Sequence, residues 1–361
     1  MARRFWAMVL LGFAAPAAAE RADPRILPEN PSYARNAACA RIDPPPPERM
    51  PLSQGDSAIC FAYATADMVS QRVGRRVSAL DVANTFYFAD PAQLARARDP
   101  RVARHVARRP DLLDEIARER NRVDVNLDGN PTRKPFFDKL EGGEEDLASL
   151  MLNVKGLCLA RDLPSDDGYT HVWPYLKARR TAAGLAPPIN YCARATGATV
   201  EKMRDPVADR ANAEWFAHVE RRCRRFVSPV PLLPVSYRIA AHQEEFIERK
   251  RRGDHATREE RARMFAMIDY ALDHKRNPTI GYSFYLLQAR AADDPDEYAD
   301  HSSAVIGRRK VGGACQYLVQ DNTGELCFKF RPEIAARCTL GRIWLTESEL
   351  ADTLYSVIYL R

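Results

Sequence analysis

The chain has 361 residues, of which 46% are hydrophobic and 28% are charged, and its formal net charge is +6. This length and apolar share are typical of a globular protein with a sizeable core, built as one large domain with insertions or as two domains. The net charge permits weak attraction to acidic surfaces but is too small to indicate a nucleic-acid-binding protein.

Residues 1–19 have the three parts of a secretory signal peptide. Arg3 and Arg4 form the basic start, residues 5–15 the apolar stretch and residues 17–19 a cleavage site of three alanines. The apolar stretch is too short for a comfortable membrane span, and no later segment is long and apolar enough for one. We therefore expect a bacterial exported protein, secreted or periplasmic.

Residues 20–50 are polar and rich in proline, which predicts an N-terminal strap before a main domain over residues 51–361. A helix is predicted to begin at Cys60 and to end at Arg72, because apolar residues recur on one side and Gly74 stops the helix. Ser78 has the position of an N-cap and predicts a second, short helix.

Two charged stretches, over residues 89–140 and 177–275, are predicted to be helical insertions. Between them, residues 144–156 have the apolar spacing of an amphipathic helix. The last helix of the second insertion is expected over residues 261–274, with a buried set made of Phe265, Ile268, Tyr270 and Leu272.

Beyond Pro278 the pattern changes to β-branched and aromatic runs separated by turn residues, which predicts strands. The expected strands cover residues 279–288, 303–308, 315–320, 326–330 and 355–360. Helices followed by an antiparallel sheet indicate an α+β fold.

The eight cysteines fit an exported protein, because disulfides form in oxidising compartments. If Cys60 stays a free thiol, the other seven allow at most three bridges. Cys315 and Cys327 flank an expected strand pair, so we expect a bridge between them.

The sequence indicates no metal and no cofactor. It contains no Cys-x-x-Cys pair, which argues against a zinc site. Residues 124–130 resemble the first half of a calcium loop, but Pro135 stands where the loop needs a bidentate glutamate, so a solvated turn is the better interpretation.

The strongest chemical pattern lies around Cys60. A thiol at a helix N-terminus is favoured as the thiolate, because the positive end of the helix dipole lies beside it. Gln54, six positions upstream, can direct its side-chain amide at the oxyanion that forms when the thiolate attacks a carbonyl, and the backbone N–H of Cys60 can donate as well.

A thiol nucleophile needs a base, and His301 is the best of the seven histidines. It alone opens a strand that is expected to be buried, whereas most of the others lie in charged helical stretches. A third residue must orient the imidazole. Asn322 follows an expected strand at its exit turn and suits this role, with the adjacent Asp321 as a possible substitute.

Taken in order, the glutamine, the Cys60-Phe61 pair, the Asp300-His301 pair before an apolar strand, and the later Asn322 turn resemble the papain family of cysteine peptidases. The resemblance covers roughly residues 50–85 and 277–325. It implies a papain-like two-lobed fold, with a helical left lobe, an antiparallel β right lobe and a cleft between them. Phe61 stands where the family usually has tryptophan, and the Ser-Trp-Gly that usually follows the asparagine is absent.

By this resemblance Cys60 is the nucleophile, His301 the general base and acid, Asn322 the orienting residue and Gln54 the oxyanion donor. Gly142 and Gly143 resemble the family's glycine pair, whose backbone aligns a substrate strand.

The sequence thus predicts a peptidase that cleaves peptides or proteins through a thioester acyl-enzyme. Two other hypotheses remain: a papain-like binding protein without the chemistry, and a related thiol acyl-transfer enzyme that acts on cell-wall peptides. Rapid, pH-dependent alkylation of Cys60 distinguishes an enzyme from a binding protein.

Overall fold

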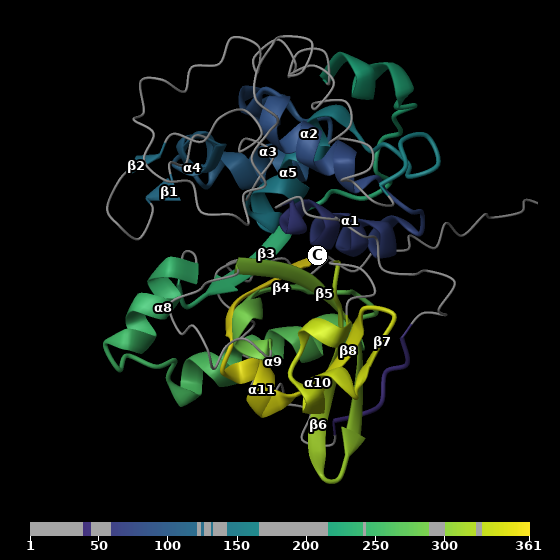
Figure 1. Cartoon of the computed structure of the whole chain (residues 1–361). Coiled ribbons are helices and arrows are strands. Elements are labelled where there is room, and N and C mark those ends of the chain that lie inside the picture. Colours follow the sequence, from purple (N-terminus) through teal and green to yellow (C-terminus); the bar gives the residue numbers. More distant parts are fainter. Residues whose placement is uncertain are drawn as a thin grey trace, which may run out of the picture.

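Figure 1 shows the computed structural model of the chain. The structure describes residues 39–44, 59–120, 124–125, 131–132, 143–165, 216–240, 243–288, 300–322 and 327–361. The predicted signal peptide, Gln54 and Gly142 lie outside these residues. So do parts of the two predicted insertions, namely residues 121–123, 126–130, 133–140, 177–215 and 241–242.

The first half of the described chain is mainly helical. Its helices are α1 (Cys60–Val73), α2 (Ala79–Phe88), the 3-10 helix η2 (Pro91–Arg96), α3 (Pro100–Ala107), α4 (Leu112–Arg120) and α5 (Glu145–Lys155). The short strands β1 (Asp124–Val125) and β2 (Pro131–Thr132) pair with each other.

The second half forms a seven-stranded antiparallel sheet with the order β3-β9-β4-β5-β6-β8-β7. The strands are β3 (Pro234–Arg238), β4 (Thr279–Ser283), β5 (Asp300–Val311), β6 (Ala314–Gln320), β7 (Cys338–Thr339), β8 (Arg342–Thr346) and β9 (Leu354–Leu360). The helices are α8 (Gln243–Arg251), α9 (Arg258–Asp273), α10 (Pro332–Ala335) and α11 (Glu347–Ala351), with the 3-10 helices η5 (Phe284–Leu287) and η7 (Cys327–Lys329). The mixture of helices and an antiparallel sheet confirms the predicted α+β class.

Local sequence signals set several helix boundaries. Gly74 ends α1 in the left-handed conformation at φ 69°, which glycine adopts without the steric cost of a Cβ. Ser78 caps α2, since its hydroxyl accepts a hydrogen bond from the backbone N–H of Asp81. Gly156 follows α5. These three predictions are confirmed.

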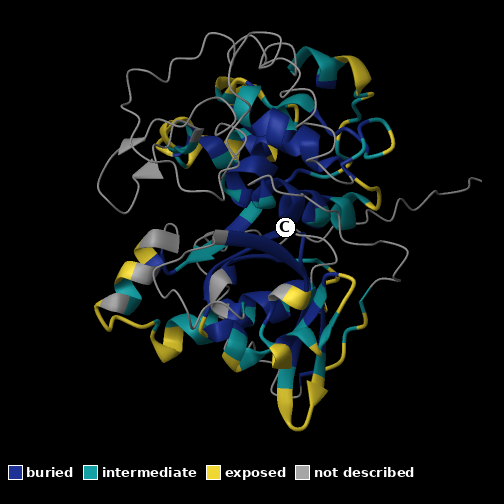
Figure 2. Cartoon of the chain, in the orientation of Figure 1, coloured by how far each residue is buried: buried dark blue, intermediate teal, exposed yellow. Residues whose placement is uncertain are grey.

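Two large hydrophobic clusters form most of the core of the described residues. One gathers the buried faces of α1, α2 and α5 around Phe61, Phe86 and Met151. The other lies between the sheet and α9, around Phe265 and Tyr317. Figure 2 shows the buried parts of these elements in dark blue, with the exposed tip of the β5–β6 hairpin pointing away from them in yellow. In Figure 1 helix α1 lies next to β4 and β5, at the junction of the two parts.

Three disulfides join the described residues: Cys39–Cys315, Cys158–Cys223 and Cys327–Cys338. The predicted Cys315–Cys327 bridge is therefore wrong. Cys315 lies at the hairpin end of β6, whereas Cys327 follows the opposite end. Five strand residues separate those ends by roughly 17 Å, beyond the reach of a disulfide.

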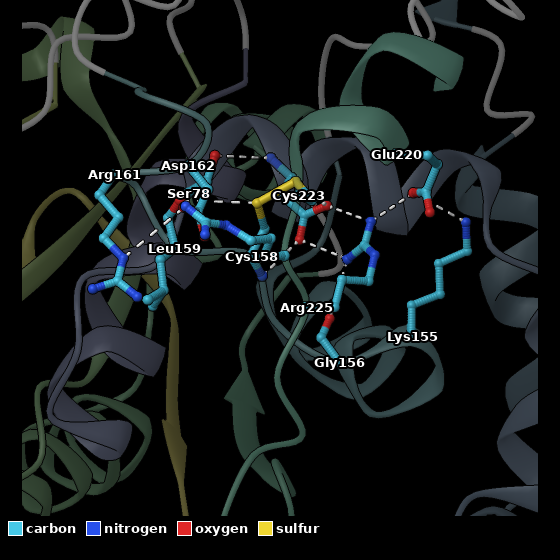
Figure 3. Close-up of a disulfide and its surroundings, with 12 residues drawn as sticks. Ser78, Lys155, Gly156, Cys158, Leu159, Arg161, Asp162, Glu220, Cys223 and Arg225 are labelled. Carbon is cyan, nitrogen blue, oxygen red and sulfur yellow. Dashed lines mark hydrogen bonds and ion pairs between the residues drawn. A yellow bond between two sulfur atoms is a disulfide. The ribbon is translucent and has the colours of Figure 1, made fainter.

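The Cys158–Cys223 bridge is accompanied by a partly buried charge network around the buried Asp81. Arg225 donates to both carboxylate oxygens of Asp81, at 3.0 and 2.8 Å, and forms an ion pair with Glu220 at 2.6 Å. Figure 3 shows Arg225 and Lys155 both directed at Glu220 beside the disulfide. The network holds residues 216–226 against α2 and α5.

Of the predicted N-terminal strap, the structure describes residues 39–44. Ile42 of the strap forms a β-bridge with Arg308 of β5, and the Arg308 guanidinium donates to the carbonyl of Ala40 at 2.9 Å. Together with the Cys39–Cys315 bridge, these contacts attach this part of the strap to the sheet.

Other expectations need correction. Residues 327–329 form a 3-10 helix and not a strand, because the Cys327–Cys338 bridge holds them in a short loop. Residues 234–238, inside a predicted helical insertion, form β3, which is stabilised by pairing with β9. Strand β8 was not predicted. Tyr270 is only half-buried, and its ring stacks on His274.

Within the described parts of the chain, no helix has the length and apolar character needed to cross a membrane.

Candidate active site

Cys60 is the first residue of helix α1. The preceding residue, Ile59, provides no side-chain cap, and the first turn carries no acidic residue. Cys60 is half-buried and free of disulfides, while the three residues after it are fully buried. The helix therefore presents a thiol at its positive end, fixed by a well-packed first turn.

His301 lies at the beginning of β5, opposite Tyr282 of β4. It is 4% exposed. Its Nε2 lies 2.7 Å from Oδ1 of Asp321, and the Phe284 ring packs on it with a centroid distance of 4.8 Å. The imidazole is thus held by a carboxylate on one side and by aromatic rings on another.

Asp321 and Asn322 follow β6, the neighbour of β5. The antiparallel register pairs Ala304 with Gln320, so residues just after β6 lie beside the beginning of β5. The Asn322 amide nitrogen bonds to two backbone carbonyls. Its Nδ2 donates to the carbonyl of Cys60 at 3.1 Å and to that of Ser302 at 2.9 Å.

One amide nitrogen therefore joins the first residue of α1 to the residue after His301. Asp321, the weaker of the two sequence candidates, makes the contact with the imidazole that was expected of Asn322. Asn322 instead links the two backbones. The Asn322 hydrogen bonds bring Cys60 near the beginning of β5, where His301 and Asp321 contact each other, although 241 to 261 residues separate Cys60 from these two.

Tyr282 lies behind this group and is fully buried. Burial raises the pKa of its phenol well above the usual value, and the nearby Asp321 and Cys60 side chains raise this pKa further. The phenol stays neutral, and its hydroxyl lies 3.0 Å from the Ser303 hydroxyl. The Tyr282 side chain therefore contributes no charge to the site.

Gly143 of the predicted glycine pair lies against Phe61, the residue after Cys60. Its φ is +155°, and a Cβ placed on it would lie 2.8 Å from two atoms of the Phe61 ring. Only glycine allows the backbone to approach the residue after Cys60 so closely. Gly142 and Gln54 lie outside the described residues, so their predicted roles stay predictions.

Sequence reasoning missed a second link between α1 and β6. Nε2 of Gln320 donates to Oδ2 of Asp67 at 2.7 Å. Burial raises the pKa of Asp67 to about 6, although the Gln320 hydrogen bond and the charges of Arg76 and Arg342 lower it. The available signal was a lone carboxylate in the apolar run that begins at Cys60.

Among the described residues, one group has metal-ligand geometry: Asp81 with Cys158 and Cys223. Both cysteines are in a disulfide, and Arg225 occupies the carboxylate. This group is therefore a structural network and does not fit a metal.

No protein-family model matches the chain, and no curated protein matches it. Solved structures do match it, and two of them each align with 86% of the chain. PepW from Lactobacillus rhamnosis HN001 is 12% identical over 80% of its own chain, with a TM-score of 0.37. Procathepsin L 3 from the larval midgut of Tenebrio molitor is 9% identical over 66% of its chain, with a TM-score of 0.34. Likeness at this level defines neither a family nor an activity, so the function is inferred from the geometry of the site.

Proposed function

We propose that this chain is a papain-like thiol peptidase with Cys60 as nucleophile, His301 as general base and acid, and Asp321 as the residue that orients His301. The observation that carries the proposal is the Asn322 amide, which bonds to the Cys60 and Ser302 carbonyls beside the His301–Asp321 pair. It supports a thiol outside any disulfide, at a helix N-terminus, lying next to an oriented imidazole.

The proposed reaction begins when the Cys60 thiol gives its proton to Nδ1 of His301, the ring nitrogen that does not contact Asp321. The thiolate attacks the carbonyl carbon of the peptide bond, and the carbonyl oxygen takes up the negative charge. The backbone N–H of Cys60 and the side chain of Gln54 would donate to that oxygen.

Collapse of this intermediate breaks the C–N bond, and His301 passes its proton to the leaving amine. A thioester remains on Cys60. His301 then removes a proton from water as the water attacks the thioester, which releases the carboxylic product and restores the thiol.

Asp321 replaces the asparagine of the Cys-His-Asn constellation. A carboxylate can hold the imidazole orientation as an amide does, and it also stabilises the imidazolium that forms during the reaction. Asn322, in this proposal, keeps α1 in register with β5.

The substrate is proposed to be a peptide segment in extended form. Gly143, which has no Cβ and is partly exposed, lies against Phe61 in the first turn of α1, and accessible backbone can pair with an extended peptide. The predicted signal peptide and the three disulfides support an exported protein.

The test is the pH dependence of Cys60 alkylation by iodoacetamide, measured by peptide mass spectrometry. We expect rapid alkylation already near pH 6 in the wild type. In His301→Ala the rate should rise only toward the usual thiol pKa of about 8.5. Casein cleavage should be lost in both Cys60→Ala and His301→Ala. A wild-type alkylation profile like that of an ordinary thiol would favour the binding-protein hypothesis.

The carboxylate partner of His301 also favours a second candidate, a thiol acyl-transfer enzyme that acts on cell-wall peptides, since it departs from the Cys-His-Asn pattern. Release of muropeptides from purified peptidoglycan, with no cleavage of casein, would select this candidate. Both reactions require Cys60, so Cys60→Ala serves as the control in each assay.

A further inference from the structure

We propose that Gln320 and Asp67 form a positioning pair which, together with Asn322, fixes helix α1 against the His301–Asp321 pair. This inference rests on the proposed function. Neither Gln320 nor Asp67 belongs to the predicted catalytic set, and neither contacts the reacting atoms in the proposed mechanism.

The residues at the end of β6 contact α1 and His301 in alternation. Successive residues of an extended chain point to opposite sides. Gln320 and Asn322 both reach α1, at Asp67 and at the Cys60 carbonyl, while Asp321 between them contacts His301. One short segment therefore holds the nucleophile's helix with two residues and the base with the third.

The two contacts hold α1 at two points along its axis. Asp67 follows Cys60 by seven residues, which is about two turns or about 10 Å along the axis. A helix held at Cys60 alone could pivot about that point. The second contact at Asp67 removes this freedom, so the direction in which α1 presents the thiol depends on both contacts.

The strength of the hydrogen bond between Gln320 and Asp67 depends on the charge of Asp67. The groups that face Asp67 are the Gln320 amide, Arg76 just after α1, and Arg342 of β8, which pairs with Gln320 in the sheet. Because the pKa of Asp67 is about 6, the carboxylate is ionised above that pH, and a hydrogen bond to an ionised acceptor is roughly twice as strong as a neutral one. The Gln320–Asp67 hydrogen bond should therefore be stronger above pH 6 than below it, although the buried carboxylate itself is less stable in its ionised form.

A charge at Asp67 also acts directly on the site, but a thiolate–imidazolium pair carries no net charge. A carboxylate two turns away therefore opposes the thiolate and favours the imidazolium to a similar degree. We therefore expect Asp67 to affect the site mainly through its contact with Gln320, which positions α1.

The experiment compares Gln320→Met with Gln316→Met, a matched change on the same strand. Gln316 instead accepts from Arg309. We expect Gln320→Met to lower kcat by up to about 10²-fold with little change in KM, since a misplacement of about 1 Å can cost that much. Gln316→Met should keep the wild-type kcat. Thermal melts confirm that both variants fold.

Asp67→Asn separates the hydrogen bond from the charge, because an asparagine oxygen still accepts from Gln320. In the wild type, the Cys60 alkylation rate should rise through a step near pH 6. Asp67→Asn should lack this step and keep most of the activity at pH 7, whereas Asp67→Leu should lose activity as Gln320→Met does. An unchanged pH profile in Asp67→Asn would overturn the role of the charge.

Hydrogen exchange over residues 60–66 tests the positioning without thiol chemistry. Faster exchange in Gln320→Met than in Gln316→Met supports the pair, and equal exchange overturns it. If the wild-type thiol proves unreactive while this difference persists, the proposed peptidase function fails but the contact that holds α1 stands.

Discussion

The His301–Asp321 contact is the residue-level feature with the clearest consequence for activity. Asp321→Ala removes the acceptor at Nε2, so the imidazole loses its orientation. We expect kcat/KM to fall by about 10²-fold or more, the lower end of what general acid–base catalysis contributes. Asp321→Asn should lose less, because an amide oxygen can still accept from the ring.

Rates of casein cleavage by the folded variants test this expectation. Asp352→Ala, at an exposed position, is the matched control and should cleave at the wild-type rate. Equal activity of Asp321→Ala and the wild type would remove Asp321 from the mechanism.

Gly143 provides a second residue-level prediction. Gly143→Ala places a methyl group 2.8 Å from the Phe61 ring, so Phe61, the neighbour of Cys60, must move. We expect cleavage per folded molecule to fall at least tenfold, with the loss mainly in kcat/KM. Wild-type kinetics in this variant would show that the close approach is unrelated to substrate.

Glu144 links residue-level electrostatics to stability. Burial raises the pKa of its carboxyl well above the usual value, despite the ion pair with Arg238 at 2.7 Å, and Asp146 and Glu145 raise it further. A raised folded-state pKa means that the stability from the protonated form is complete below the ordinary carboxyl pKa and is lost as the pH rises through the raised value.

Glu144→Gln mimics the neutral form. Between pH 5 and pH 8 its free energy of unfolding should fall less than that of the wild type, as measured by urea denaturation at both pH values. Glu259→Gln, at an exposed position of α9, should keep the wild-type pH dependence. Parallel pH curves for Glu144→Gln and the wild type would contradict the desolvation argument.

At the scale of elements, α1 can be weakened at the end opposite Cys60. Gly74 has a φ of 69°, and a Cβ there would meet nothing within 4 Å. Gly74→Ala should therefore cost only the backbone penalty of about 1–2 kcal/mol for a left-handed residue. Gly74→Asn should cost less, because asparagine adopts this conformation more readily.

Urea denaturation measures this loss, and the activity of the folded enzyme should not change. Gly143→Ala serves as the contrasting variant. Both glycines have positive φ, but only Gly143 lies beside Phe61, so only its substitution should reduce activity. A loss of activity in folded Gly74→Ala would show that the far end of α1 also affects the thiol.

At the scale of the whole molecule, the disulfides differ in the length of chain that they close. Cys39–Cys315 spans 276 residues and Cys327–Cys338 spans 11. In the loop-entropy description, the longer bridge should stabilise the fold by about 3 kcal/mol more. We expect the Cys39→Ser/Cys315→Ser double variant to lose correspondingly more stability than Cys327→Ser/Cys338→Ser.

Guanidinium denaturation of the two double variants under non-reducing conditions measures the difference. Equal losses would indicate that native contacts, such as the Ile42–Arg308 bridge, hold the strap without its disulfide.

The sequence by itself determined the features that depend on neighbouring residues. The spacing of apolar residues, Gly74 and Ser78 defined α1 and α2, because capping and periodicity act within a few residues. The same local reasoning placed a thiol at a helix N-terminus and a histidine at the beginning of a strand.

The tertiary structure alone decided the features that depend on distant contacts. Strand β3 exists through its pairing with β9, and the disulfide partners follow from which strand ends lie together. The choice of Asp321 over Asn322 and the Gln320–Asp67 pair could not be predicted, because the sheet register and the position of α1 against β6 set which side chain faces which partner. A shift of one residue in an extended chain reverses every side chain, and no local pattern reports that shift.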